Sequence, residues 1–294
     1  MIDAPPASTA AALELVRLGP LMTLSSGSAE IGVGLVDGPV AVDHPDLVTA
    51  RILPAGDDAG ASSRSGSGAC VHGTFVAGIL AARRGSGAPA ICPGCTLLVR
   101  PIFRETEPDG SLPTATPDDV GRAIVECVNA GARVVNLSAA TGAPTTRLEG
   151  SLRQALDHAA RRRALVVAAA GNQATLGSSE ITRHPGVIAV VAYDLDGQPM
   201  DQSNFGRSPG RRGLGAPGDG IVSLAADGSP APRAGTSAAA PFITGAIALL
   251  WSLFPTADAG SVRRALSHGL RRTTVIPPLM DAQAAYELLA RGFR

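Results

Sequence analysis

Apolar and polar positions follow one another along the chain in blocks, and these blocks predict strands and helices in turn. Short apolar runs bounded by glycine, proline or polar residues predict buried strands. These runs lie at residues 31–40, 96–103, 133–140, 164–172, 186–194 and 220–226. Helices are predicted at 9–18, 72–83, 117–132 and 148–163, with two more near the carboxyl end. The chain therefore alternates between strand and helix over most of its length.

This alternation predicts the fold class. Fully apolar strands that alternate with helices of ten or more residues are typical of a parallel sheet covered by helices on both faces. Residues 49–70, rich in glycine, serine, alanine and aspartate, are predicted to be a loop. No break in composition marks a second large domain. We therefore expect an α/β protein with an amino-terminal extension and short helix at residues 1–28 and one large domain at 29–294.

Residues 233–254, RAGTSAAAPFITGAIALLWSLF, are almost wholly apolar, with Thr236 and Ser237 at the start of the predicted helix. A hydroxyl there is typical of a helix cap. The run is also of borderline length for a membrane span, although Pro241 interrupts it. A third interpretation is a nucleophilic Ser237, because the positive end of the helix dipole stabilises developing negative charge. The stretch alone leaves all three open.

Composition narrows the classes of partner. The 294 residues are 45% hydrophobic, with 25 basic and 25 acidic residues and a net charge of 0. This balance predicts neither a nucleic-acid partner nor an anionic membrane surface. The first residues lack the basic region of a signal peptide. We therefore predict a cytoplasmic protein, in which disulfides are not the default state of cysteine.

Four polar residues are directed to one edge of the predicted sheet. Asp37 ends the first strand, Asn172 ends the strand at 164–172, and His72 and Ser237 begin helices. Strand carboxyl ends and helix amino termini meet at the same edge, where ligands bind. Each residue alone also fits a turn or cap. Together they supply the hydroxyl, imidazole, carboxylate and amide of nucleophilic acyl transfer.

The motifs around these residues carry a family resemblance. VDGPVAVDHPDL, HGTFVAGI, VVAAAGN, SNFG, GAPG and GTSAAAP occur in the order and spacing of subtilisin-like serine proteases, the S8 subtilases. The resemblance implies a three-layer subtilisin-like α/β fold and an endopeptidase that forms an acyl-enzyme on Ser237, without cofactor or metal. It implies Asp37, His72 and Ser237 as the catalytic triad and Asn172 as the oxyanion donor.

Within the family, SSGSAEIGVGLVDGPVAVDHPDL and PGCTLLVRPIF are most similar to the PatA/PatG-type maturation proteases of cyanobactin and related pathways. This similarity implies a peptide or protein substrate, specifically a ribosomally made precursor peptide. As in that group, we expect no long folding pro-segment. Two rivals remain: a transpeptidase or macrocyclase, and a catalytically silent peptide-binding module.

The segment between Asp37 and His72 bears on the first rival. Macrocyclases of this group are expected to carry a helical insertion there, which would cover the cleft and keep water away. Here the middle of the segment is the predicted loop, which we expect to be mobile and open to water. The sequence therefore favours hydrolysis over cyclisation.

The resemblance also implies a substrate cleft lined by Ser138, Ala139, Ala140, Ala169 and Gly171. The family usually has Ser-Leu-Gly at the first three of these positions. A methyl group at Ala140 crowds a place that is normally bare, so the family's side-chain preference does not transfer.

Metal and disulfide expectations follow from what the chain lacks. The calcium-binding insertion of the family is missing from AARRGSGAPAI, and Asp46 alone is a weak ligand, so no structural calcium is predicted. The spacing of Cys92 and Cys95 fits zinc. Topology disfavours a four-cysteine site, because Cys70 belongs at the catalytic edge and Cys127 at the opposite one. A disulfide from Cys127 to Cys92 or Cys95 stays open, and Cys70 is predicted to be a free thiol near the site.

Overall fold

A seven-stranded parallel sheet crosses the centre of the molecule in the computed structural model, which describes residues 7–56, 66–103, 115–138 and 150–292. The sheet order is β2-β3-β1-β4-β5-β6-β7, and each neighbouring pair is parallel. The strands are β1 Gly32–Asp37, β2 Arg51–Pro54, β3 Thr96–Pro101, β4 Ala132–Leu137, β5 Leu165–Ala169, β6 Val187–Tyr193 and β7 Leu214–Pro217. An antiparallel pair, β8 Ile221–Leu224 and β9 Pro230–Arg233, lies apart. The predicted α/β class is confirmed.

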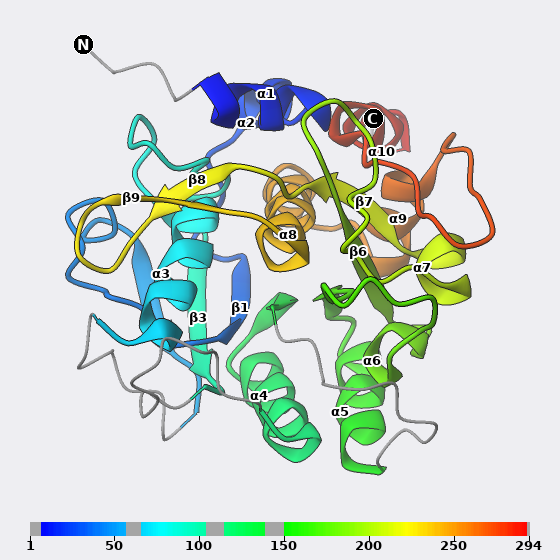
Figure 1. Cartoon of the computed structure of the whole chain (residues 1–294), viewed down its shortest axis with the longest axis horizontal. Helices are drawn as coiled ribbons and strands as arrows, with labels where there is room; N and C mark the ends of the chain where they lie inside the picture. The colour runs from blue at the N-terminus through cyan, green and yellow to red at the C-terminus, as the bar shows by residue number, and fades with distance from the viewer. Residues whose placement is uncertain (1–6, 57–65, 104–114, 139–149, 293–294) are drawn as a thin grey trace.

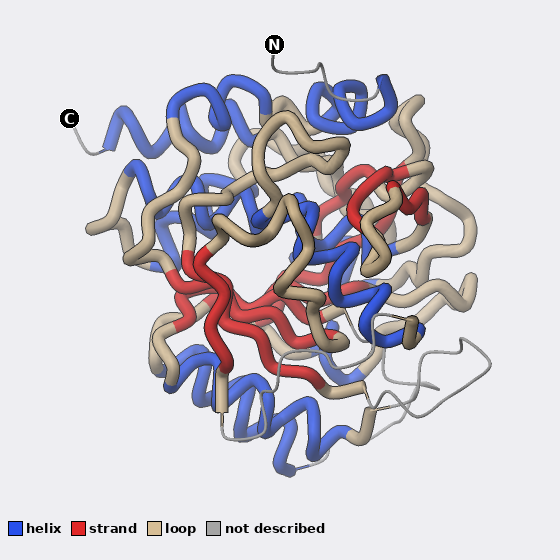
Figure 2. The backbone as a smooth tube through the Cα atoms, turned by 90° about the vertical axis from the view of Figure 1, so that its left-hand side faces the viewer, coloured by secondary structure: helices blue, strands red, loops and turns tan. Residues whose placement is uncertain are grey.

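Helices cover both faces of this sheet (Figures 1 and 2). One face carries α4 Pro117–Asn129, α5 Gly150–Arg161 and α6 Glu180–Arg183. The other carries α1 Ala7–Leu15, α2 Gly19–Leu24, α3 Gly68–Ala81, α8 Thr236–Leu253, α9 Ala259–Ser267 and α10 Ala282–Gly292, while α7 Arg207–Arg212 packs beside β6. Successive strand residues face opposite sides. Val134 therefore packs on the α8 side and Val135 on the α4 side.

The start of α3 differs from the prediction. The hydroxyl of Ser67 accepts a hydrogen bond from the backbone N–H of Cys70 at 3.1 Å, so it caps the helix. The helix thus begins at Gly68, four residues before His72. His72 therefore lies in the second turn rather than at the start. The sequence did not reveal the first turn, because its small residues show no apolar periodicity.

Helix α8 fills the core on its side of the sheet. Among the described residues it is the one helix long and apolar enough to cross a membrane, but 83% of it is buried inside the fold. Gly235 stands at its N-cap position and has no side chain that could cap this end. The capping interpretation of Thr236 and Ser237 is therefore wrong, and the apolar run is explained by core packing rather than by a membrane.

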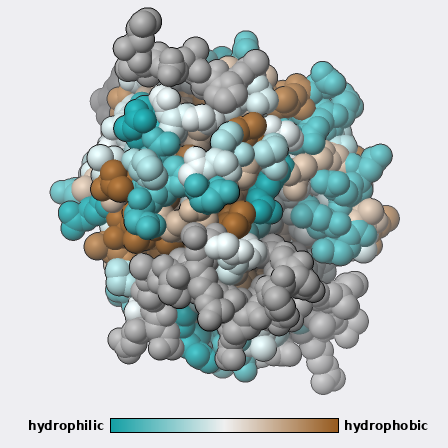
Figure 3. Space-filling view, turned by 60° about the vertical axis from the view of Figure 1, so that its left-hand side comes forward, coloured by the Kyte–Doolittle hydropathy of each residue, from teal (hydrophilic) through white to brown (hydrophobic). Residues whose placement is uncertain are grey.

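The surface agrees with the interpretation of α8 as a core helix. The exposed large apolar side chains are Leu24, Val42, Val48, Leu53 and Leu176, which lie in separate segments. On the face shown in Figure 3, the described apolar residues form small groups among hydrophilic ones. No continuous apolar band crosses the described part of that face.

The sequence predicted a loop throughout residues 49–70, but part of this segment forms a strand. Strand β2 pairs with β3 at the edge of the sheet. Its side chains are mostly exposed, so it lacks the apolar run of a buried strand, and its closing Pro54 is tolerated at an edge. Strands β7 and β9, four residues each, were not predicted either. Residues 57–65 lie outside the described residues.

The cysteines correct another expectation. All four are free and buried. Cys92 and Cys95 belong to the core on the α8 side, whereas Cys127 belongs to the core on the α4 side. The sheet separates Cys127 from the other two, so the disulfide that the sequence left open does not form. Burial raises the pKa of Cys127 to about 12, which keeps its thiol protonated.

Candidate active site

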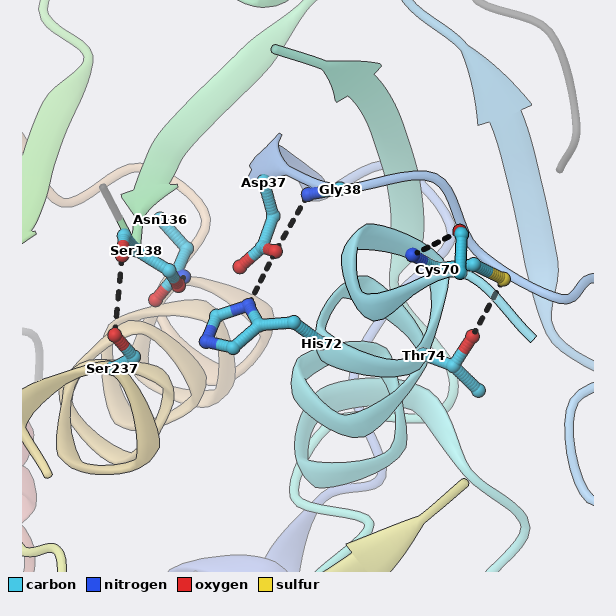
Figure 4. A network of polar contacts seen from close by, with 9 residues as sticks. Asp37, Gly38, Cys70, His72, Thr74, Asn136, Ser138 and Ser237 are labelled. Carbon is cyan, nitrogen blue, oxygen red and sulfur yellow. Dashed lines mark hydrogen bonds and ion pairs between the residues drawn. The ribbon is translucent and has the colours of Figure 1, made fainter. Parts of the chain in front are cut away.

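Asp37 and His72 form a buried pair at the carboxyl edge of the sheet (Figure 4). Asp37 ends β1 and is 0% exposed, and its Oδ1 lies 2.6 Å from Nδ1 of His72. The same oxygen accepts a hydrogen bond from the backbone N–H of Gly38 at 2.6 Å. A carboxylate that holds the Nδ1 proton leaves Nε2 able to accept another. In Figure 4 this nitrogen faces the side on which Ser237 lies.

Two glycines allow α3 to approach the end of β1 closely enough for this contact. A Cβ atom on Gly73 would lie 2.3 Å from the carbonyl oxygen of Pro39. A Cβ atom on Gly38 would lie 1.9 Å from the carbonyl oxygen of Ala69. Neither distance is tolerable, and backbone oxygens cannot swing aside as side chains do. The Asp-Gly and His-Gly pairs in the sequence therefore set the spacing of carboxylate and imidazole.

Ser237 is the second residue of α8 and faces the same edge. Its hydroxyl donates a hydrogen bond to the backbone oxygen of Ser138 at 3.1 Å, just beyond the end of β4 (Figure 4). The hydroxyl proton is thus held by a carbonyl in this state. Transfer of that proton to His72 requires the hydroxyl to turn toward the imidazole.

A buried hydrogen-bond chain fixes α8 against β4. The Thr244 hydroxyl donates to Oδ1 of Asn136 at 2.9 Å, and Nδ2 of Asn136 donates to the hydroxyl of Ser138 at 2.8 Å. Thr244 and Asn136 are both 0% exposed. Polar groups buried this deeply are costly to leave unpaired, so the chain specifies one register between helix and strand. Ser237 is positioned by that register.

Asn172 lies three residues beyond β5 and is oriented by Thr236. Its Oδ1 accepts hydrogen bonds from the backbone N–H of Thr236 at 2.9 Å and from the Thr236 hydroxyl at 3.0 Å. With the oxygen held in this way, Nδ2 remains as a donor that has no acceptor among the described residues. A Cβ atom on Gly235 would lie 2.7 Å from this nitrogen. The sequence did not identify Thr236 as the residue that orients Asn172, although Thr236 directly precedes Ser237.

Asn204 holds the loop that carries Asn172. Its Oδ1 accepts hydrogen bonds from the backbone N–H groups of Gln173 at 3.0 Å and Thr175 at 3.2 Å. A Cβ atom on Gly171 would lie 2.3 Å from Nδ2 of Asn204, and the φ angle of Gly171 is +104°. Both facts require glycine at 171. The SNFG motif was the available signal for Asn204.

The predicted cleft residues are only partly described. Ser138 and Ala169 are buried at the ends of the neighbouring parallel strands β4 and β5. Ala139 and Ala140 lie outside the described residues. The assignment of these positions and of Gly171 to substrate binding stays a prediction.

No metal centre is evident in the described part of the chain, where no group of three or more His, Cys, Asp or Glu side chains is placed to hold an ion. The Asp46 carboxylate pairs instead with the Arg83 guanidinium at 2.8 Å. Cys70 is fully buried two residues before His72, with its sulfur 3.7 Å from the Thr74 hydroxyl. It is a free thiol beside the site, as predicted.

Known proteins resemble this chain in sequence and in fold. Fervidolysin of Fervidobacterium pennivorans is 30% identical over 283 residues, which cover 87% of this chain and 39% of fervidolysin. The protease domain of PatA is 32% identical, with a TM-score of 0.83 over 90% of this chain and 97% of that domain. The PatG macrocyclase domain has a TM-score of 0.80 over 92% of this chain and 95% of that one, but at 21% identity the likeness concerns the fold alone.

The chain thus spans well under half the length of fervidolysin and nearly all of the PatA protease domain. The sequence model of the subtilase family, Peptidase S8, matches residues 28–283, which is most of the chain. That stretch contains every element of the parallel sheet and each residue of the candidate site. The chain belongs to the subtilase family.

Proposed function

We propose that this subtilase is a serine endopeptidase that cuts a ribosomally made precursor peptide. The proposal is supported by the likeness to PatA, which is known as the patellamide maturation protease. The observation that carries the chemistry is the buried 2.6 Å contact between Asp37 and His72 at the edge where α8 presents Ser237. A buried carboxylate and imidazole beside a serine at a helix start form the arrangement that acyl transfer needs.

In the proposed reaction, Oγ of Ser237 attacks the carbonyl carbon of the scissile bond. Nε2 of His72 takes the serine proton and later gives it to the leaving amine, while Asp37 fixes the imidazole and stabilises its cation. Water then attacks the acyl-enzyme by the reverse sequence of proton transfers. Every proton moves between groups of this chain, the substrate and water, so the scheme needs no cofactor or metal.

Asn172 is the proposed donor to the oxyanion. Its oxygen is occupied by Thr236, so its Nδ2 is aimed without any rearrangement at the moment of reaction. A donor that is already oriented stabilises developing charge more than one that must turn. The positive end of the α8 dipole adds to this stabilisation at Ser237.

Hydrolysis and cyclisation differ only in what resolves the acyl-enzyme. The described residues between Asp37 and His72 include β2 and, before α3, no helix that could cover the cleft. We therefore propose that water, rather than the amine of the substrate, attacks the acyl-enzyme. Incubation with a precursor peptide and mass spectrometry test this: linear products heavier by one water support hydrolysis, and a dominant water-free mass would identify a macrocyclase.

A fluorophosphonate probe tests the chemistry separately from the substrate. An enzyme with an activated serine is labelled once per molecule at Ser237, whereas a silent peptide-binding module stays unlabelled. We also propose a cytoplasmic location, because all four cysteines are free thiols and a reducing compartment keeps them so.

A further inference from the structure

A cavity of about 360 Å³ lies at the amino-terminal edge of the sheet, opposite the candidate active site. It is bordered by the start of β4, the ends of α4 and α5, and the turn before α9. Three arginines line it: Arg133, Arg162 and Arg163. The one acidic residue in its lining is Asp258.

Asp258 compensates at most one of these three positive charges. Its carboxylate caps α9, accepting hydrogen bonds from the backbone N–H and the hydroxyl of Ser261, both at 2.8 Å. Arg162 and Arg163 are exposed and have no acidic partner among the described residues. The cavity therefore carries an uncompensated positive charge in a protein whose overall charge is 0.

Arg133 forms the floor of the cavity. Its guanidinium stacks 4.4 Å above the ring of Trp251 and donates hydrogen bonds to the carbonyl oxygens of Pro255 at 3.0 Å and Ala257 at 3.3 Å. These contacts hold a cation in place in a partly buried position. A cation fixed in this way is oriented before any ligand arrives, which lowers the entropy cost of binding.

The backbone at Arg163 is the second observation. Helices α4 and α5 lie side by side (Figure 1). Residues that follow each helix line the cavity. After α4 the left-handed position is filled by Gly131, with φ +101°, as is usual. After α5 the same position is filled by Arg163, with φ +60°, inside a complete helix-ending motif: the Ala164 N–H donates to Ala159 and the Arg163 N–H to Ala160.

A left-handed conformation is unfavourable for a residue with a Cβ atom. The contrast with Gly131 shows that the fold accepts glycine at this kind of position. Arg17, Ala90 and Ala174 adopt similar left-handed φ angles of +51°, +48° and +51°. What distinguishes Arg163 from these residues is that its side chain joins those of Arg133 and Arg162 in the lining of the cavity.

The positive charge continues along the edge. Arg263 of α9 donates to the carbonyl oxygens of Pro185 at 2.6 Å and Val187 at 3.3 Å, which places it at the start of β6. Arg133 is the second residue of β4, Arg162 and Arg163 precede β5, and Arg263 contacts the start of β6. Since β4, β5 and β6 are neighbours in the sheet, four arginines span three adjacent strands. We refer to Arg133, Arg162, Arg163 and Arg263 as the basic edge.

We propose that the basic edge is an exosite that binds an acidic segment of the peptide substrate, away from the cleaved bond. Guanidinium groups pair strongly with carboxylates, and a row of them across three strands suits an extended chain with several acidic side chains. The inference rests on the proposed peptidase function. It adds a substrate class, a peptide with a distal cluster of Asp or Glu.

The geometry sets the spacing in that substrate. Strands β5 and β6 have five and seven residues, so the two edges of the sheet are roughly 20 Å apart through the molecule. An extended peptide spans about 3.3 Å per residue and must follow the surface around this distance. The acidic cluster is therefore expected about 10 residues from the scissile bond.

Binding is tested first with the inactive Ser237→Ala protein and a fluorescein-labelled Glu-Gly repeat peptide. The variant Arg162→Ser/Arg163→Gly should weaken binding at least about tenfold, the effect of about 1.4 kcal/mol. Raising salt from 50 to 500 mM should have a similar effect, because exposed charges are screened. The matched control is Arg51→Gln/Arg153→Gln, which removes two exposed charges elsewhere and should bind like the parent.

Equal loss in the control would show that net charge, not the basic edge, is responsible, and would overturn the proposal. Tighter binding of a single-stranded oligonucleotide or of inorganic phosphate at the same arginines would overturn the assignment to an acidic peptide. Because Arg163→Gly relieves strain, loss of binding with an unchanged or higher melting temperature cannot be ascribed to misfolding.

Catalysis gives the second test. Two substrates share one scissile sequence and carry, about 10 residues away, either an acidic or a neutral tail. The acidic tail should lower KM for the wild type and not for Arg162→Ser/Arg163→Gly, with kcat the same in both. Equal KM values for the two tails would refute the exosite while leaving the peptidase intact, whereas failure to cut the neutral substrate would refute the peptidase itself.

Discussion

The two edges of the parallel sheet are built on different principles. At the carboxyl edge, functional groups are brought together by close backbone approach at Gly38 and Gly73, and the Asp37 carboxylate holds the His72 imidazole. At the amino edge, arginines extend over the strand starts and their charges are left unpaired. The first edge suits chemistry at one bond, and the second suits recognition of a charged segment. The proposed reaction site and the proposed recognition site therefore lie at opposite ends of the same strands.

The largest expected effect belongs to the carboxyl edge. Ser237→Ala should lower kcat by a factor on the order of 10⁶, the loss seen when the nucleophilic serine is removed from subtilisin, because the variant lacks the hydroxyl proposed to form the acyl-enzyme. Active-site titration and steady-state kinetics measure it. Activity within tenfold of the wild type would refute the triad.

The oxyanion donor comes next. Asn172→Ala should lower kcat by roughly 10²–10³ with little change in KM, again a magnitude known from subtilisin, because the lost hydrogen bond forms only in the transition state. An unchanged kcat would mean that Asn172 is only a turn residue.

Thr236 tests positioning at the same edge. Thr236→Val keeps the shape but removes the hydroxyl that holds the Asn172 oxygen, so kcat should fall about tenfold, in line with the net value of one hydrogen bond. In an Asn172→Ala background the same change should have no further effect on kcat. Thr182→Val, which removes another buried hydroxyl remote from the site, serves as the control for stability. Additive effects of the two substitutions would contradict positioning through Asn172.

The smallest effect concerns the two helix ends at the amino edge. Arg163→Gly should raise the free energy of unfolding by about 0.5–1 kcal/mol, and Gly131→Ala should lower it by a similar amount, because each left-handed position favours glycine. Urea unfolding of both variants measures the difference. Destabilisation by Arg163→Gly would mean that the arginine supports the fold and would weaken the case for its role in binding.

The sequence was informative where apolar runs were long and motifs were local. Helix α8 and the buried strands other than β7 follow from the apolar runs, and Asp37, Asn172 and Ser237 were selected by their places at predicted element ends. Strand β2 was missed because an exposed edge strand has no apolar run. The disulfide of Cys127 was left open because the topological argument assigned residues to edges of the sheet and not to its faces. The sequence did not predict the basic edge, because a net charge of 0 does not reveal a local excess of positive charge.

Helix α8 carries Ser237, the proposed nucleophile, in its first turn and fills the core along the rest of its length. A helix in this position cannot detach without uncovering the sheet, so the nucleophile is not exposed to fraying as it would be on a surface loop. Heat damage should therefore be all-or-none. In a heated sample fewer molecules should be folded, but each folded molecule should keep its full activity. Active-site titration should therefore report the number of folded molecules.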